Sequence, residues 1–188
     1  MVEVRWHGRG GQGAKTAAQL LALAQMGAGL SVQAFPEYGP ERSGAPMLAY
    51  NRADSRRIRR HDGVEHPDYA VVLDASLWAE TDPTRGLGPE GLLVVNSEEA
   101  PDSLARRTGF TGRIWSVPAN ALAQAAGSAY VNVVLVGVVA RVVGDVPEAA
   151  LMDAVVELLG PRLDQGRLQA ALAATQAGYR WADKERVA

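Results

Sequence analysis

The stretch VEVRWHGRGGQG (residues 2–13) decides the fold of this 188-residue chain. Its first half alternates apolar and polar residues, a period of two that predicts a half-buried strand over residues 2–7. Its second half, GRGGQG, fits the pattern G-x-G-x-x-G and precedes a predicted helix over about residues 11–27. The apolar residues of that helix recur at helical spacing and are Ala17, Leu20, Leu21 and Ala24. The opening unit is therefore a strand, a glycine-rich loop and a helix.

A glycine-rich loop at the start of a helix is suited to binding a phosphate group. Glycines allow a tight turn, and the amides and positive dipole end of the helix attract negative charge. A turn that uses glycine only for packing carries equal weight. A nicotinamide dinucleotide site is less favoured, because the expected acid about 20 residues beyond the glycines is represented only by Glu37, which lies late and in a turn. The candidate ligand-binding residues are Gly8, Arg9, Gly10, Gly11, Gln12, Gly13 and Lys15.

The remaining strands are predicted from short apolar runs between turn residues. Residues 31–36 and 45–51 are extended and separated by glycine and proline, which favours an antiparallel pair. The continuous apolar runs at 70–73 and 92–95 are typical of central strands that are buried on both faces, and a further strand is expected at 113–117.

Helices alternate with these strands along the chain. We expect helices at 75–80, 101–108, 118–127, 147–159 and 163–181, and a buried helix at 131–143, where valine alone also allows a strand. The alternation predicts one α/β domain over residues 1–188, with three layers, a mostly parallel sheet, a Rossmann-like opening unit and an antiparallel strand pair.

Composition excludes several kinds of chemistry. The chain has no cysteine, so it cannot ligate an iron–sulfur cluster through thiolates, and three histidines are too few for a His-rich metal site. No stretch is long and apolar enough for a membrane helix, and we expect a cytoplasmic protein with no membrane contact. The net charge of −2 argues against a dedicated nucleic-acid binder.

Two blocks of sequence carry a resemblance to a known family. They are RWHGRGGQGAKTA (residues 5–17) and QAFPEYGPERSGAP (residues 33–46). In this order and at this spacing they resemble the gamma subunit of pyruvate or 2-ketoisovalerate ferredoxin oxidoreductases. The length of the chain and the later order of strands and helices agree, so the resemblance covers nearly the whole chain.

The resemblance implies a subunit of an enzyme that oxidatively decarboxylates a 2-oxoacid to an acyl-coenzyme A and passes electrons to ferredoxin. Thiamine diphosphate and the iron–sulfur clusters then belong to partner subunits, ferredoxin is met through the complex, and this chain is inactive alone. In single-chain relatives the corresponding domain is associated with coenzyme A, which by analogy assigns a phosphate-bearing ligand to Gly8–Gly13. No catalytic residue and no metal ligand are carried over.

Other polar residues have both a functional and a structural interpretation. Arg42 is a candidate for binding a phosphate or carboxylate, although fixing its own loop against a partner subunit is favoured. Asp74 and Asn96 end two central strands, where ligands collect, but capping of the next helix, by Asp74 and by Asn96 or Ser97, is favoured. His7 either meets a ligand phosphate or faces solvent.

A basic run between residues 52 and 61 is the densest in the chain. It comprises Arg52, Arg56, Arg57, Arg59, Arg60 and His61, and we favour a solvated loop over a contact with an acidic partner or with the extra phosphate of coenzyme A. Besides the subunit hypothesis, two alternatives stay open at this point. They are a free-standing nucleotide- or dinucleotide-binding module and a purely structural adaptor.

Overall fold

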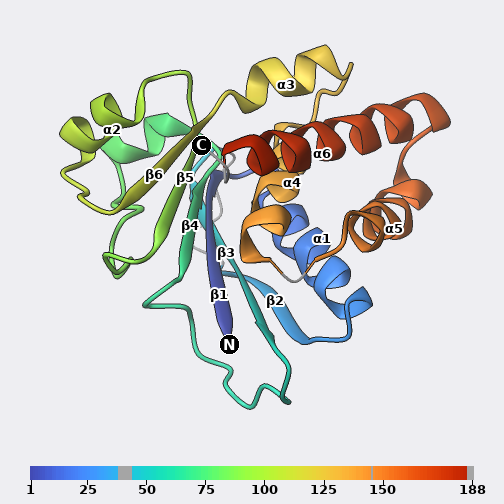
Figure 1. Ribbon diagram of the computed structural model, residues 1–188, viewed down its shortest axis with the longest axis horizontal. Helices are drawn as coiled ribbons and strands as arrows, with labels where there is room; N and C mark the ends of the chain where they lie inside the picture. The colour runs from blue at the N-terminus through green and yellow to red at the C-terminus, as the bar shows by residue number, and fades with distance from the viewer. Residues whose placement is uncertain (38–43, 145, 186–188) are drawn as a thin grey trace.

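A computed structural model describes residues 1–37, 44–144 and 146–185 of the chain, and it contains a six-stranded sheet in the order β2-β3-β1-β4-β5-β6 (Figure 1). Strand β3 runs antiparallel to both of its neighbours, whereas β1, β4, β5 and β6 pair in parallel. The predicted antiparallel pair in a mostly parallel sheet is confirmed. The strands are β1 (Val2–Arg9), β2 (Ser31–Glu37), β3 (Pro46–Asp54), β4 (Tyr69–Val72), β5 (Leu92–Asn96) and β6 (Arg113–Val117).

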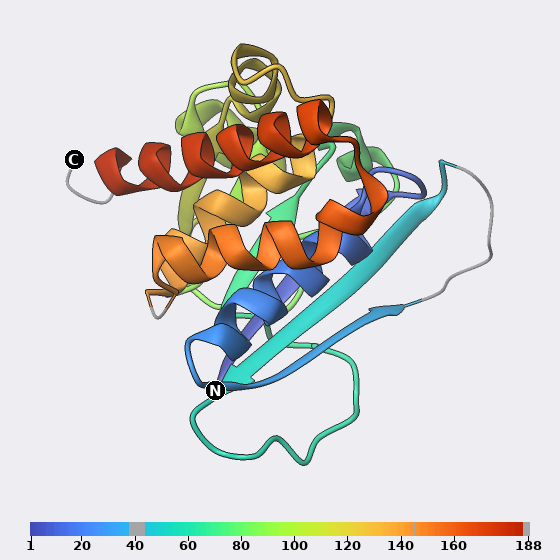
Figure 2. The same ribbon diagram turned by 90° about the vertical axis from the view of Figure 1, so that its right-hand side faces the viewer.

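The helices lie on both faces of the sheet, so the three-layer α/β prediction is confirmed. Helices α1, α4, α5 and α6 cover one face, and the 3-10 helix η1 and helix α2 lie on the other (Figure 1). Figure 2 shows α6 lying along α4 in the outer part of the larger helical layer. The helices are α1 (Ala14–Gly27), η1 (Ala75–Ala79), α2 (Pro101–Thr108), α3 (Ala119–Ala125), α4 (Val131–Val143), α5 (Glu148–Leu159), η2 (Gly160–Arg162) and α6 (Gln165–Glu185).

Strand β1 is buried on both faces from Val4 to Gly8, so the prediction of a half-buried strand was wrong for its centre. Trp6 packs into the core with α1, and its indole Nε1 donates a hydrogen bond to Asn51 at 3.2 Å. Arg5 and His7 point to the opposite face, because side chains alternate along a strand. Both are nevertheless buried, since segments 63–66 and 81–86 of the chain cover this face.

Helix α4 matches its predicted boundaries at Val131–Val143. It is buried from Asn132 to Ala140, because it lies among the sheet, α1 and α6. The tendency of valine to form strands is therefore outweighed by the burial of this segment as a helix between other elements of the fold. The predicted helix at 75–80 instead forms the shorter 3-10 helix η1. None of the helices in the described part of the chain is long and apolar enough to cross a membrane.

Candidate functional site

The candidate site lies where the carboxyl ends of β1 and β4 meet. These two strands are parallel neighbours, and the segments that follow them leave toward opposite faces, α1 to one and η1 to the other. In open α/β sheets such a divergence creates the crevice in which ligands bind. The glycine loop, residues 8–13, ends β1 at this point, as the sequence predicts.

The loop has a backbone conformation that glycine adopts readily and that other residues do not. Gly11 has a φ of 94° and Gly13 a φ of 83°, conformations that residues with a Cβ rarely adopt. Two amides that the sequence argument assigned to a phosphate are engaged within the protein. The Gly10 amide donates to the Ala45 carbonyl at 2.9 Å, and the Gln12 amide donates to the Arg9 carbonyl at 3.0 Å. The loop is thus held by one hydrogen bond within itself and one to the residue that precedes β3.

The N-terminus of helix α1 follows directly. Its N-cap is Gly13, which supplies no side-chain hydrogen bond, and its first turn carries no acidic residue. Lys15 lies in that turn and is exposed. Asn132 of α4 donates from Nδ2 to the Gly13 carbonyl at 3.2 Å, which ties the start of α1 to the core. The positive end of the helix dipole therefore has no protein carboxylate in its own first turn.

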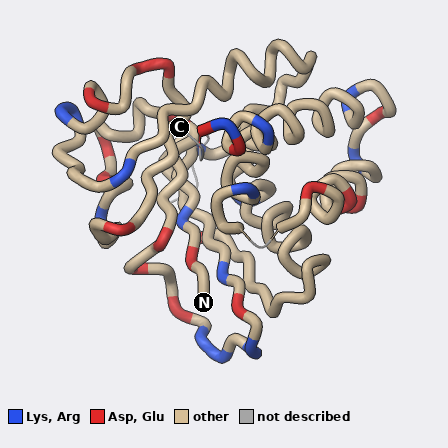
Figure 3. The backbone as a smooth tube through the Cα atoms, in the orientation of Figure 1, with Lys and Arg blue, Asp and Glu red and all other residues tan. Residues whose placement is uncertain are grey.

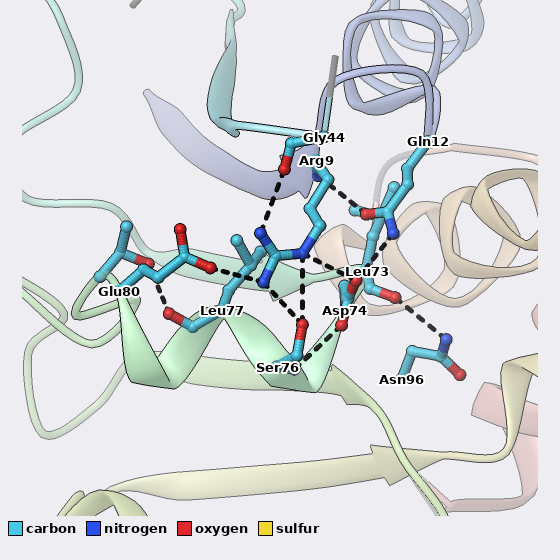
Figure 4. A network of polar contacts seen from close by, with 10 residues as sticks. Arg9, Gln12, Gly44, Leu73, Asp74, Ser76, Leu77, Glu80 and Asn96 are labelled. Atoms are coloured by element: carbon cyan, nitrogen blue, oxygen red, sulfur yellow. Dashed lines mark hydrogen bonds and ion pairs between the residues drawn. The ribbon is translucent and has the colours of Figure 1, made fainter. Parts of the chain in front are cut away.

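Arg9 is bound within the protein by several groups at the edge of the sheet (Figure 4). Its guanidinium donates to Glu80 at 2.7 Å, to the Ser76 hydroxyl at 2.8 Å, to the Gly44 carbonyl at 3.1 Å and to Asp74 at 3.2 Å. The hydrogen bond to Glu80, together with the charges of Glu80 and Asp74, raises the pKa of Arg9. Arg9 thus joins the glycine loop to η1.

Gln12 and Asp74 complete this network. The Gln12 side chain accepts from the Arg9 amide at 2.8 Å and donates to Asp74 at 2.8 Å. Asp74 also accepts from the Ser76 amide at 2.9 Å, so its predicted role as the cap of η1 is confirmed. Burial acts to raise the pKa of Asp74, but hydrogen bonds from Ser76 and Gln12 and the charge of Arg9 outweigh it and lower that pKa. Asp74 is an ionised carboxylate beside the loop.

Asn96 also lies at this edge but does not cap a helix, so the favoured capping prediction was wrong for it. Its Nδ2 donates to the Leu73 carbonyl at 3.0 Å and to Asn120 at 3.3 Å. Ser97 accepts from the Glu99 amide, yet α2 begins only at Pro101 and has no side-chain cap. Asn96 instead links the residue that follows β4 to the first turn of α3, because its short amide reaches both partners.

A cavity of about 820 Å³ lies on the face of β1 that is turned away from α1. His7 lines it and is only 4% exposed, so the alternative in which His7 faces solvent is wrong. Sequence reasoning missed this cavity, because the polar positions of an alternating strand normally face water. Two buried polar residues at alternate positions, Arg5 and His7, were the available signal.

The remaining candidates divide between buried, exposed and undescribed positions. Arg42 and most of its turn lie outside the described residues. Arg52 is fully buried, which contradicts a solvated position, whereas Arg56, Arg57, Arg59 and Arg60 are exposed. Arg52 donates from Nε to Glu3 at 2.5 Å and from Nη2 to the Gly63 carbonyl at 3.0 Å. It differs from the others because it lies within β3, between two paired strands.

The fold and the residues at the carboxyl ends of β1 and β4 define a Rossmann-like α/β domain. Its helix α1 has no side-chain cap and begins where the segments after these two strands leave toward opposite faces of the sheet. The chain belongs to the pyruvate ferredoxin/flavodoxin oxidoreductase family, whose sequence model matches residues 3–181. It is 42% identical to the pyruvate synthase subunit PorC of Thermotoga maritima, over 94% of this chain and 92% of that relative. It is 39% identical to the pyruvate/ketoisovalerate oxidoreductases common subunit gamma of Thermococcus kodakarensis, over 91% and 94% of the two chains.

Solved structures agree with this assignment. The crystal structure of the Thermotoga maritima pyruvate oxidoreductase subunit PORC superposes with a TM-score of 0.82 at 39% identity, covering 95% of each chain. A 2-oxoglutarate:ferredoxin oxidoreductase from Magnetococcus marinus, with 2-oxoglutarate, coenzyme A and succinyl-CoA bound, gives a TM-score of 0.78 at 20% identity. That match covers 97% of this chain and 31% of the other, and it shows a shared fold. The resemblance to the gamma subunits is confirmed.

Proposed function

We propose that this chain is the gamma subunit of a pyruvate- or 2-ketoisovalerate-type ferredoxin oxidoreductase, in which it contacts coenzyme A and helps to hold the complex together. The observation that carries the proposal is its similarity to the Thermotoga maritima subunit over nearly the full length of both chains. Thiamine diphosphate and iron–sulfur clusters would be held by partner subunits, since this chain has no cysteine for a cluster. Ferredoxin would be met through the complex, and the isolated chain is expected to be inactive.

The contact with coenzyme A is assigned to the start of helix α1. Backbone amides at a helix N-terminus bind phosphate groups, and this one lacks both a side-chain cap and a first-turn acid. A Cβ placed on Gly11 would meet nothing within 4 Å, so the space beside the loop is open to a ligand. Gly10 and Gln12 use their amides internally, which narrows the contact to the remaining amides of the loop and to the turn that starts at Gly13.

Two cationic residues of the described chain lie beside this contact. Arg9 donates to Asp74, Ser76 and Glu80, and Lys15 is exposed in the first turn of α1, so both are candidates for a charged contact. Arg42 remains a candidate that lies outside the described residues. A structure of a relative by fold, the Magnetococcus marinus enzyme, holds coenzyme A and succinyl-CoA, which supports a coenzyme role for this class of complex.

A first prediction tests the phosphate contact in the assembled complex. Gly11→Val puts a branched side chain into the open space beside the loop, and we expect the Michaelis constant for coenzyme A to rise about tenfold, equivalent to the loss of one charged hydrogen bond. Decarboxylation of the 2-oxoacid without coenzyme A should be retained. Steady-state kinetics of the reconstituted complex at varied coenzyme A concentrations measures both quantities.

The matched control is Gly29→Val at the other end of α1. Gly29 has a φ of 87° and, like Gly11, nothing within 4 Å of an added Cβ, so the backbone strain is the same. The control should leave the Michaelis constant for coenzyme A unchanged. If the folded, assembled Gly11 variant also keeps its dependence on coenzyme A, the loop is a packing turn and the proposed contact is wrong.

The alternative of a free-standing nucleotide-binding module is not favoured. The family model covers residues 3–181, which include the glycine loop on which that alternative rests. Co-purification of the native chain distinguishes the two hypotheses, because a gamma subunit should elute with larger iron–sulfur subunits. A monomer that binds a nicotinamide dinucleotide tightly and elutes alone would instead support the module.

A further inference from the structure

The 820 Å³ cavity beside β1 has the size of a ligand site, since such sites span roughly 300–1,000 Å³. It lies on the side of the sheet opposite α1, beside η1, whose Leu77 lines it. Strands β1 and β3 form its floor, and the segments at 63–66 and 81–86 form its walls. It is therefore a second compartment, separated from the start of α1 by the sheet.

Arg5 holds the walls of the cavity in place. One terminal nitrogen donates to the carbonyls of Val64 and Glu65 at 3.3 and 3.4 Å, and the other donates to those of Pro83, at 3.2 Å, and Arg85. The remaining donor, Nε, is bound to His7 Nε2 at 3.0 Å. All five guanidinium N–H groups are thereby used, so Arg5 shapes the cavity and has no donor left for an occupant.

His7 is set up as a hydrogen-bond donor. Because its Nε2 accepts from Arg5, the neutral ring carries its proton on Nδ1. Burial and the charge of Arg5 lower the pKa of His7 to about 3, which keeps the ring neutral. Its Nδ1–H has no hydrogen-bond partner among the described residues, and the side chain, only 4% exposed, lines the cavity. The Nδ1–H is not itself among the fully buried atoms, so it is open to the cavity and can donate to an occupant.

Acceptors lie across the floor from this donor. His7 of β1 is paired with Leu48 of β3, which is paired with Glu37 of β2, so the three side chains form one row on one face. Two strand spacings separate the ends of the row, about 10 Å. The Tyr50 hydroxyl donates to Glu37, which orients the carboxylate at the mouth. The row thus presents a donor, an apolar surface and an acceptor in that order.

Charge argues against a phosphate as the occupant of the cavity. Glu37, Glu65 and Asp82 line it, and of its two arginines Arg5 has no donor left while Arg85 is exposed. A neutral group is preferred where acids surround a compartment, because an anion would be repelled. The apolar part of the lining, which includes Met47, Leu48 and Leu77, suits a flat ring.

We propose that this cavity binds an uncharged, aminated heteroaromatic ring such as adenine, which accepts a hydrogen bond from His7, lies on Leu48 and donates to Glu37. The inference deepens the proposed function, because coenzyme A contains adenine and can leave its phosphates at the edge of the sheet. A nucleotide such as ATP is the other source of the same ring. The shared chemistry is a planar base with an acceptor and an amino group.

Adenosine, which has no phosphate, is the probe for the cavity. Calorimetry and ligand-observed NMR with the full chain should show saturable binding of adenosine. Leu48→Trp fills the floor of the cavity and should weaken that binding at least tenfold, whereas the volume-conserving Leu48→Met should leave it within about twofold. Circular dichroism and the melting temperature show whether both variants fold. His7→Gln, which keeps an acceptor for Arg5 but moves the donor away from its place on the ring, should also weaken the binding of adenosine, and it decides the test if Leu48→Trp does not fold.

Competition identifies the source of the ring. If coenzyme A displaces adenosine and 4′-phosphopantetheine does not, the occupant is the adenine ring of coenzyme A. If ATP displaces adenosine more strongly than coenzyme A does, the same cavity binds the ring of a nucleotide. Three results would each overturn the inference. They are a failure of adenosine to reach saturation, equally strong binding of adenosine to the folded Leu48→Trp and His7→Gln variants, and displacement of adenosine by inorganic pyrophosphate. The kinetics of the Gly11→Val variant do not depend on these binding measurements. The proposed phosphate contact can therefore be confirmed when the proposed base site is wrong, and the base site can be confirmed when the phosphate contact is wrong.

Discussion

At the scale of single residues, neighbours in the sequence with the same charge have opposite environments. Arg52 is fully buried in β3, while Arg56 is almost fully exposed four residues later. Arg52 pairs with Glu3 and lies over the ring of Phe35, its guanidinium carbon 5.7 Å from the ring centroid. The position within a paired strand, and not the local density of charge, therefore decides what each arginine does.

We predict that Arg52→Met lowers the free energy of unfolding by about 3 kcal/mol, because it leaves Glu3 without its partner inside the fold. Arg56→Met is the matched control and should change the free energy by less than about 0.5 kcal/mol, since its ion pair with Asp54 is exposed on the arginine side. Urea unfolding followed by circular dichroism measures both. Equal effects of the two substitutions would contradict the assigned role of Arg52.

His7 predicts a specific dependence of stability on pH. Its pKa in the folded chain is about 3, below its ordinary value of 6.5, so between these values the unfolded chain binds a proton that the folded chain does not. Stability contributed by neutral His7 is present above pH 6.5 and is lost as the pH falls toward 3, by at most about 1.4 kcal/mol per pH unit.

The substitution His7→Gln should flatten this slope, because glutamine accepts from Arg5 without titrating. Urea unfolding between pH 6.5 and 4.5 isolates the effect from most carboxylates. His61→Gln, at an exposed position, serves as the control and should keep the slope of the original chain. Identical slopes for the original chain and His7→Gln would mean that His7 is not buried as a neutral ring.

At the scale of elements, the contact between α4 and α6 depends on two glycines. A Cβ on Gly137 would lie 2.1 Å from the Thr175 carbonyl oxygen, and one on Gly178 would lie 2.0 Å from the Val134 carbonyl oxygen. The helices can approach so closely only because each presents a bare backbone to the other. This pair makes the most extensive contact between elements of the described chain and covers the core over the sheet.

We predict that Gly137→Ala and Gly178→Ala each lower the free energy of unfolding by about 2–3 kcal/mol, because the two backbones must separate to admit a methyl group. Gly166→Ala near the start of α6 is the control. Its added Cβ meets only Asp164 at 3.4 Å, and alanine in a helix gains about 0.5–1 kcal/mol over glycine. Thermal and urea unfolding should therefore give opposite signs for the two kinds of site.

At the scale of the whole molecule, positive charge collects at the end of the sheet opposite the glycine loop. The connection between β3 and β4 carries the exposed arginines and stands out as a basic segment in Figure 3. Asp62 pairs with Arg60 in this connection, and that hydrogen bond lowers the pKa of Asp62 to about 2. Arg57 and Arg59 are exposed on the same segment and are the natural choice for testing a partner contact.

We predict that Arg57→Glu with Arg59→Glu weakens assembly with the partner subunits in a salt-dependent way, because exposed charge pairs across an interface are screened. Dissociation constants measured at low and high salt should differ more for the original chain than for the variant. Arg162→Glu with Arg167→Glu, at exposed positions around the start of α6, is the matched control. Unchanged assembly at every salt concentration would return the segment to the solvated-loop interpretation.

The sequence by itself determined the order of elements, the strand–loop–helix unit and the membership of a family, because local periodicity, glycine spacing and two long motifs are encoded in neighbouring residues. It did not reveal the internal use of the Gly10 and Gln12 amides, the buried Arg52 or the cavity at His7. Each of these depends on which segment covers which face of the sheet. Pairing across β2, β3 and β1 brings together residues far apart in the chain, and only the tertiary structure sets that arrangement.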